Sequence, residues 1–239
     1  MTSQRWAWVE IDLSALQRNV RTLCSHVYPR QLWAVVKANA YGHGSHQVAP
    51  ADLDAGATGL CVALADEGIE LRQAGITAPI LVMSEQPSSQ YGAMIEHELT
   101  ATVYNSVAIS MYAATAQSLG RIAKVHLKVD TGMHRVGVPV ADAVSRAQQI
   151  VAETSLQLDG LYTHFATADL ADHPATTTQS ERFAHIVDQL HQVGIAPPQV
   201  HLANSAATVR GLGADSTMVR VGIAMYGIAA NAETDSFGV

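Results

Sequence analysis

The chain has 239 residues, 48% of them hydrophobic and 15% charged, which suits one large domain with a well-filled core. The net charge of −7 comes without a basic run, which argues against nucleic acid or an anionic membrane surface as a partner. Residues 1–8 lack the basic start and apolar stretch of a secretory signal, and no segment approaches the roughly 18 consecutive apolar residues of a membrane span, so we expect a cytoplasmic protein.

Short β-branched runs alternate with helical periods along the chain. A first strand is expected at Trp8–Ile11, leading into a helix that begins near Asp12 or Ser14, both good N-cap residues. The strands expected after this unit are Leu32–Val36, Leu60–Ala63, Ile80–Met83, Ala101–Tyr104, Lys124–Val129, Leu158–Thr163, Gln199–Leu202 and Met218–Val221. The helices expected between them are Ser45–Ala55, Ala65–Gln73, Ser88–His97, Ser106–Leu119, Val140–Glu153, Thr177–Val193 and Ser205–Arg210.

This alternation predicts an α/β fold, a (β/α)8 TIM-type barrel over residues 1–228. Strands separated by helices favour parallel pairing with right-handed crossovers, and eight such units close into a barrel. An open doubly wound sheet is the alternative, although no G-x-G-x-x-G follows the first strands, which disfavours its dinucleotide-binding form. Residues 229–239 turn polar and lose their periodicity, so we expect a linker there.

The two cysteines do not suggest a disulfide or a metal site. Cys24 and Cys61 lie in apolar segments, and the chain has no CxxC motif or Cys/His cluster. We therefore expect buried free thiols in a reducing compartment and no bound metal.

Barrel enzymes carry their chemistry at the carboxyl ends of the strands, so these positions are the ones to inspect. Lys37 ends the first regular strand, L-W-A-V-V, and burying its ammonium group is costly without a partner. One interpretation is that the amine only extends to solvent at the rim. The other is a Schiff-base lysine whose pKa desolvation lowers, followed by a tight loop in which Tyr41 points inward.

Polar residues also follow the fifth and sixth of these strands. Lys128, Asp130 and Arg135 cluster at one strand end, which fits either a solvated ion pair or a functional group. His164 and Asp169 follow the next strand, and a lone histidine there is often only structural.

The last two strands end in residues suited to a phosphate. Asn204 and Ser205 open a helix after the seventh strand, while Arg220 lies on the eighth with Gly222 and Ile223 just beyond it. In barrels these two loops often bind phosphate, with help from free N–H groups at a helix N-terminus. Turn chemistry could explain each residue alone. Facing a buried lysine across the barrel mouth, they together indicate a site for an aldehyde that carries a phosphate.

These segments resemble alanine racemase, a fold-type III enzyme that uses pyridoxal phosphate (PLP). The resemblance covers nearly the whole chain and rests on V-V-K-A-N-A-Y-G-H-G, the cofactor-lysine signature of that family. It is supported by V-D-T-G-M-H-R-V-G, Y-T-H-F-A-T-A-D, H-L-A-N-S-A-A and R-V-G-I-A-M-Y-G, in the family's order. The resemblance implies PLP-dependent interconversion of L- and D-alanine, which supplies D-alanine for peptidoglycan.

The resemblance also implies a role for each of these residues in binding PLP. Lys37 would hold PLP as a Schiff base and act as the base on one face of the substrate α-carbon. Tyr41 and Ser205 would contact the phosphate. The remaining contacts implied are the amides of Gly222 and Ile223 on the phosphate, and Asn204 beside them in the pocket.

Further roles concern the cofactor ring and the substrate. Arg220 would hydrogen-bond the pyridine nitrogen with support from His164, and Arg135 would approach the phenolic oxygen and the substrate carboxylate. Lys128, carbamylated in some members, would orient Arg135. Lys37, Arg135, His164 and Arg220 are thus the catalytic candidates.

The resemblance leaves part of the family's active site without a counterpart. In the family a tyrosine from a C-terminal β-domain of the partner subunit, in a head-to-tail homodimer, is the second base. We expect that domain to be missing, because residues 237–239 end the chain about where it would start. A smaller departure is Pro50, expected to interrupt the helix after the lysine loop.

Three interpretations follow. The chain is a piece of a full alanine racemase, a stand-alone PLP-binding barrel without catalysis, or a racemase for serine or another small amino acid. If the barrel itself contains a second base, Tyr162 and Tyr226 are the first candidates, because both lie near strand ends.

Overall fold

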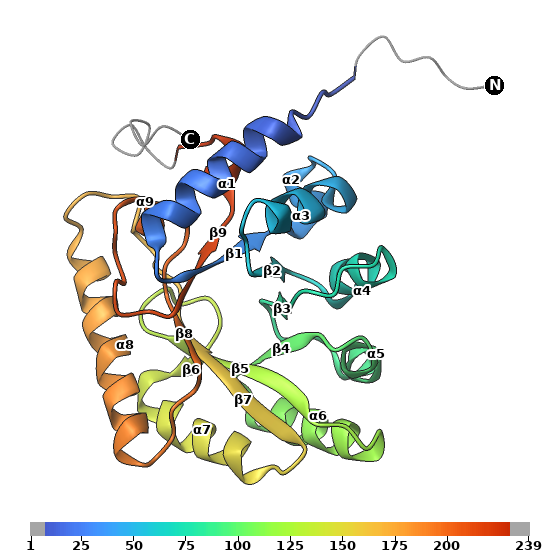
Figure 1. Cartoon of the computed structure of the whole chain (residues 1–239). Helices are drawn as coiled ribbons and strands as arrows, with labels where there is room; N and C mark the ends of the chain where they lie inside the picture. The colour runs from blue at the N-terminus through green and yellow to red at the C-terminus, as the bar shows by residue number, and fades with distance from the viewer. Residues whose placement is uncertain (1–7, 230–239) are drawn as a thin grey trace.

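Eight short strands pair in parallel and nearly close into a barrel in the computed structural model, which describes residues 8–229 (Figure 1). The order around the barrel is β8-β7-β5-β4-β3-β2-β1-β9. The bounds are β1 Gln31–Val35, β2 Gly59–Val62, β3 Ile80–Val82, β4 Thr100–Val103, β5 Ala123–Asp130, β7 Leu156–Tyr162, β8 Gln199–His201 and β9 Met218–Val221. A two-residue strand, β6 (Val138–Pro139), pairs with the end of β5 outside this ring.

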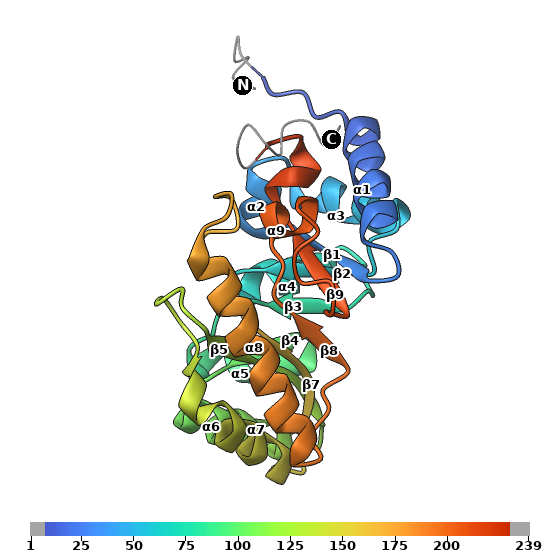
Figure 2. The ribbon, with the colours of Figure 1, turned by 90° about the vertical axis from the view of Figure 1, so that its left-hand side faces the viewer.

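Helices surround the strands, and all of them contribute buried side chains. The α-helices are α1 Leu13–Val27, α2 Lys37–Tyr41, α3 Ser45–Asp54, α4 Ala65–Gln73, α5 Tyr91–Glu96, α6 Ser106–Ser118, α7 Ala143–Ala152, α8 Pro174–Gln192 and α9 Ser205–Val209. Short 3-10 turns are η1 Ser88–Gln90, η2 Val140–Asp142 and η3 Ile223–Tyr226. In Figure 1, α3 to α6 follow one another along one side, and Figure 2 shows α8 on the outside of the opposite side. None of the helices within residues 8–229 is long and apolar enough to cross a bilayer.

The predicted barrel is confirmed, and the open-sheet alternative is wrong. β1 pairs with β2 on one side and with β9 on the other, so the first strand is not an edge. The gap between β8 and β9 is bridged by two backbone hydrogen bonds, from Thr217 N to Val200 O at 2.8 Å and from Arg220 N to Ala203 O at 3.0 Å. All eight strands of the regular alternation occur within two residues of the predicted bounds. The short β6 was not predicted.

Four other expectations concern the first strand, the cap of the helix after it, Pro50 and the linker at the end of the chain. The strand expected at Trp8–Ile11 is wrong: this segment has no regular structure, and Trp8 and Val9 are exposed, since no described strand lies beside it to accept its hydrogen bonds. The helix after it is capped as predicted, because Asp12 Oδ1 accepts from Ala15 N at 2.9 Å. Pro50 does not interrupt α3, which runs through it with the proline ring at the surface. The predicted linker lies outside the described residues apart from Ala229.

The barrel interior divides into an apolar part and a polar part. Side chains from β9, β1, β2 and β3 form one small apolar cluster: Trp33, Val35, Cys61, Leu81 and Met218. Buried polar side chains come from the remaining strands and from β9, namely Thr102, His126, Lys128, Tyr162, His201 and Arg220. Both cysteines are free, as predicted, but only Cys61 is buried and Cys24 is half-buried. Burial raises the pKa of Cys61 to about 12. The hydrogen-bonding side chains of the interior are therefore gathered in the polar part.

Gly59 makes room for the indole of Trp33 on the neighbouring strand. The two residues are paired in register, and a Cβ on Gly59 would lie 2.5 Å from the indole ring. We expect Gly59→Ala to lower the free energy of unfolding by about 1–3 kcal/mol, because the packed core cannot accept another methyl group. Urea unfolding measures this change.

The control is Gly92→Ala on α5, where a Cβ meets nothing within 4 Å. We expect it to stabilise the helix by about 0.5–1 kcal/mol. Equal stability of wild type and Gly59→Ala would mean that Trp33 does not occupy this position.

Candidate active site

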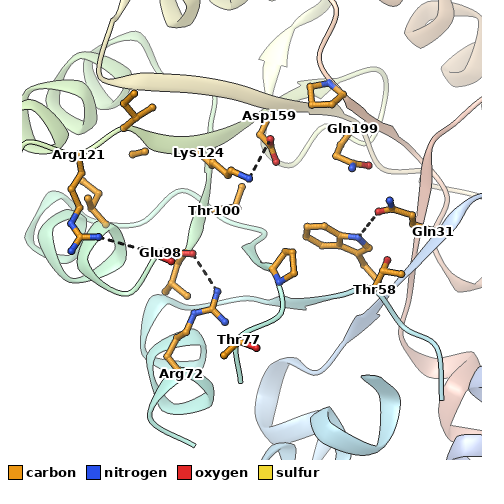
Figure 3. Close-up of a pocket in the computed structure, with 17 residues that line it drawn as sticks. Gln31, Thr58, Arg72, Thr77, Glu98, Thr100, Arg121, Lys124, Asp159 and Gln199 are labelled. Atoms are coloured by element: carbon orange, nitrogen blue, oxygen red, sulfur yellow. Dashed lines mark hydrogen bonds and ion pairs between the residues drawn. The ribbon is translucent and has the colours of Figure 1, made fainter. Parts of the chain in front are cut away.

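Two cavities lie at opposite ends of the barrel. The larger, about 640 Å³, is lined by residues at the amino ends of the strands, including Gln31, Thr100 and Gln199 (Figure 3). The smaller, about 320 Å³, is lined by residues at the carboxyl ends. Parallel barrels carry their active sites at the carboxyl ends, where the βα loops converge, so the smaller cavity is the candidate site.

Every residue predicted to bind the cofactor lines this carboxyl-end cavity. These residues come from four separate segments of the chain, and only the closure of the barrel brings them together. They are Lys37, Tyr41, His164, Asn204, Ser205, Arg220, Gly222 and Ile223. Asp169, noted at the mouth, also lines it, as do Val35, Met83 and Ala206.

Lys37 is followed by a turn of left-handed backbone. Ala38, Asn39, Ala40 and Tyr41 all have φ near +53°, although none of them is glycine. A residue with a Cβ in this region costs roughly 1–2 kcal/mol, so four in a row persist only where the surroundings hold them. The turn ends at Gly42, whose N–H donates to Ala38 O at 3.0 Å. It directs the Tyr41 ring into the cavity, with the Lys37 amine 5.8 Å from the ring centre.

Glu67, which was not identified from the sequence, anchors this turn. Its Oε1 accepts from Ala38 N at 2.6 Å, and its Oε2 accepts from Ala63 N at 2.7 Å and Leu64 N at 3.0 Å. One carboxylate thus ties the loop after β1 to the start of α4. Its position in the first turn of a helix, where a glutamate caps free N–H groups, was the available signal.

The opposite wall is built where α9 meets the end of β9. Asn204 caps α9, with Oδ1 accepting from Ala207 N at 3.0 Å. Ser205 Oγ accepts from Gly222 N at 2.9 Å and so joins the two loops. Gly222 lies against Tyr41, because a Cβ there would be 2.5 Å from the phenol oxygen. Hydroxyls and backbone N–H groups therefore converge on one wall, as an oxyanion such as a phosphate requires.

Arg220 places a permanent positive charge at the floor of the cavity. Its side chain is buried and its Nη2 donates to Thr163 O at 2.9 Å. The same nitrogen lies 3.4 Å from His164 Nδ1, and Nη1 contacts His201 Nδ1. Every one of these acceptors is a neutral group. The Arg220 guanidinium carbon also lies 5.0 Å from the centre of the Tyr162 ring, in cation–π range.

Two further buried residues, Tyr162 and His201, hold the arginine in place. Their rings stack at 4.7 Å with an interplanar angle of 4°. Tyr162 Oη donates to Met83 O at 3.0 Å and is bonded to Thr102 Oγ1 at 2.8 Å. His201 was not identified from the sequence, although its position as the last residue of β8 could have suggested it.

His164 is a neutral acceptor beside this charge. Burial lowers its pKa to about 3, with Arg220, Lys128, Arg135 and Lys37 adding to the effect. Its place as a support for Arg220 agrees with the 3.4 Å separation between their nitrogens.

Arg135 and Lys128 lie beside the main cavity rather than in it. They line a small neighbouring hollow that shares His164 with the cavity. Arg135 is exposed, whereas Lys128 is buried on β5. Burial lowers the pKa of Lys128 to about 8, helped by Arg220 and Arg135. A fraction of its amine is therefore neutral near pH 8.

The tyrosines considered as a second base do not line the carboxyl-end cavity. Tyr162 is inside the barrel with its hydroxyl engaged, and burial raises its pKa. Tyr226 stacks on His43 at 4.5 Å and its Oη donates to Val35 O at 3.4 Å. Burial also raises the pKa of Tyr226. Neither phenol is placed to exchange a proton with a ligand in the cavity.

The arrangement thus combines an amine, an oxyanion wall and a guanidinium that can only donate. Within residues 8–229 no group of three or more His, Cys, Asp or Glu side chains is placed to hold a metal ion.

Comparisons with known proteins agree with this geometry. The family model described as alanine racemase, N-terminal domain, matches residues 11–230. Alanine racemase 1 of Oceanobacillus iheyensis is 41% identical over 95% of this chain and 61% of its own length. Alanine racemase of Synechocystis sp. is 44% identical over 95% of this chain and 62% of its own length. The structure of alanine racemase from Bacillus anthracis with bound L-Ala-P superposes with a TM-score of 0.92 at 37% identity, covering 99% of this chain and 62% of that one.

The chain spans about three fifths of the length of the curated relatives it matches. Within that span the match includes the cavity and both loops of its oxyanion wall. The chain belongs to the alanine racemase N-terminal domain family.

Proposed function

We propose that this chain is the PLP-binding barrel of an enzyme that interconverts L- and D-alanine. The observation that carries the proposal is the convergence of all eight predicted cofactor residues on one cavity of about 320 Å³. Family membership supports the reaction class. The relatives are longer, so the activity of the whole protein, a homodimeric assembly, a cytoplasmic location and a small amino acid as substrate are parts of the same proposal.

The residues of the cavity fit PLP at both of its ends. Lys37 offers an amine for the aldehyde on one wall, and Tyr41 and Ser205 offer hydroxyl groups for the phosphate on the other, next to the backbone of Gly222 and Ile223. A bound PLP would supply an electron sink for the pair left when the substrate α-carbon loses its proton. Lys37 would take that proton and return it on one face of the α-carbon.

Arg220 would set the character of the cofactor ring. A guanidinium donates hydrogen bonds and does not lose its proton, so a ring nitrogen facing it stays an acceptor. Its neutral partners His164, His201 and Thr163 O hold the guanidinium without neutralising it. We propose that this limits electron withdrawal by the ring and favours rapid proton return over side reactions.

Arg135 and Lys128 would act on the substrate carboxylate from the neighbouring hollow. Arg135 is exposed at the mouth and adds a positive charge beside His164. Lys128 has the lowered pKa that reaction of its amine with carbon dioxide requires, which supports its carbamylation. The resulting carboxylate would turn Arg135 toward the cavity by charge attraction.

Lys37→Ala tests the covalent attachment of PLP. The wild-type chain mixed with PLP should show a yellow absorption band that borohydride fixes onto Lys37, located by peptide mass spectrometry. The variant should remain colourless because no amine is left at the cavity. Lys124→Ala, at the opposite end of the barrel, should behave like wild type. Labelling of another lysine in the wild type would contradict the assignment.

Gly222→Ala tests the oxyanion wall. Its Cβ would collide with the Tyr41 hydroxyl, so we expect PLP affinity to fall roughly 10- to 100-fold, corresponding to about 1–3 kcal/mol of overpacking. The double variant with Tyr41→Phe should lose less affinity than the sum of the two single losses, because they share one contact. Absorbance titration measures each affinity. Strictly additive losses would mean that Gly222 and Tyr41 do not act through a shared contact.

Exchange of the alanine α-hydrogen tests catalysis by the 239-residue chain itself. Lys37 is the proposed base on one wall, and neither Tyr162 nor Tyr226 lines the cavity. With PLP in deuterated water, we therefore expect one alanine enantiomer to exchange roughly a hundredfold faster than the other, the usual contribution of one positioned base. NMR follows the exchange. No exchange of either enantiomer would indicate a non-catalytic PLP-binding barrel, and equal rates would require a second base within the chain.

A further inference from the structure

The buried contacts of Arg220 continue down the barrel axis to its opposite end. His201 contacts Arg220 through Nδ1, and its Nε2 lies 2.9 Å from His126 Nδ1. His126 Nε2 in turn lies 3.7 Å from Asp159 Oδ2. Asp159 lines the amino-end cavity, where Figure 3 shows it beside Lys124. One line of side chains therefore joins the candidate active site to the other mouth of the barrel.

The chemistry of these groups allows only one arrangement of protons. Arginine can only donate, so His201 Nδ1 must be an acceptor and the proton of this imidazole is on Nε2. That N–H then donates to His126 Nδ1, which places the proton of His126 on Nε2 as well. Both N–H groups thus point away from Arg220 and toward Asp159. Burial lowers the pKa of both histidines, which keeps the rings neutral as this arrangement requires.

The backbone is shaped to place Asp159 at the end of this line. The register between β5 and β7 shifts at this point: Val125 pairs with Leu158, whereas His126 pairs with Gly160, which leaves Asp159 as the extra residue of a bulge. Bulges redirect side chains and are frequent near active sites. Gly160 completes the arrangement, since a Cβ there would lie 2.7 Å from the His126 ring.

Asp159 is the charged end of the line. Its pKa is lowered by the neighbouring His126 and by Lys124, so it is ionised at neutral pH. The buried His126 Nε2 has no hydrogen-bond partner in the described chain, and at 3.7 Å the carboxylate acts on it as a charge on a dipole. The dipoles of the two imidazole rings point the same way, so the negative charge of Asp159 increases the negative charge on His201 Nδ1. This nitrogen is one of the neutral acceptors of the Arg220 guanidinium.

We propose that Asp159 is a positioning residue for Arg220, acting through His126 and His201 from the far mouth of the barrel. The role of Arg220 toward PLP rests on the proposed function. The line of side chains from Arg220 to Asp159 is present in this chain whether or not that function is correct. Removing the charge of Asp159 should make the orientation of Arg220 less well defined without changing any residue that lines the carboxyl-end cavity.

Histidine-selective nitrogen-15 labelling and long-range proton–nitrogen NMR of the chain without PLP test the line directly. We expect His126 and His201 to carry their protons on Nε2, and Asp159→Asn to shift the ring nitrogens of both. Lys124→Gln is the matched control, because it removes the cation beside Asp159 and should leave His201 unchanged. A proton on Nδ1 of either ring, or a variant that shifts His126 but not His201, would overturn the proposal.

PLP titration of the same variants gives the second readout. Asp159→Asn should weaken PLP binding roughly three- to tenfold, a size typical of coupling through a buried network. His126→Asn keeps an acceptor for His201 but interrupts the line, so adding Asp159→Asn to it should cause no further loss. Additive losses would show that Asp159 acts by another route. If the NMR result holds while wild type binds no PLP, the proposed function is wrong and the line stands.

Discussion

The buried positive charge of Arg220 is the constraint on which the rest of the barrel interior depends. Removing a guanidinium from water costs several kcal/mol unless its donors are satisfied. Here the interior provides Thr163 O, the two histidine nitrogens and the face of Tyr162. None of them removes the charge, so the cation stays available to a ligand at the carboxyl ends. The polar part of the interior is thus largely the surroundings of one side chain.

This requirement also explains why the interior is divided. Trp33, Val35, Cys61, Leu81 and Met218 fill the part from β9 to β3 with apolar side chains. Strands β4 to β8, together with Arg220 on β9, carry hydrogen-bonding groups that continue from the active-site end toward the amino-end cavity. An apolar wall beside a polar network strengthens electrostatic interactions in that network, because little water competes for its donors and acceptors.

The turn after Lys37 depends on a different constraint: its strained backbone is stabilised by contacts with other segments of the chain. Four successive left-handed residues violate the local preference of an L-amino acid chain. Glu67 holds the turn from outside, and the side chain of Asn39, within the turn, accepts from Ser45 N at 2.7 Å and ties the turn to the start of α3. Such departures from local rules are typical of functional sites. In this turn the departure brings the Tyr41 ring and the Lys37 amine to the same cavity.

Much of this protein could be predicted from its sequence, because barrel topology relates sequence position directly to location. Apolar runs of strand length predicted the eight strands to within two residues. The carboxyl ends of the strands form the active-site rim of a barrel, and Lys37, Asn204 and Arg220, which were singled out at or near those ends, line the cavity there. The prediction of a strand at Trp8–Ile11 was wrong, because a strand also needs a neighbouring strand to accept its hydrogen bonds. Glu67, His201 and the link from His126 to Asp159 depend on side chains that meet across the barrel, and on a bulge that reverses the usual alternation. The local sequence pattern does not determine which side chains meet across the barrel, so only the closed tertiary structure decided these contacts.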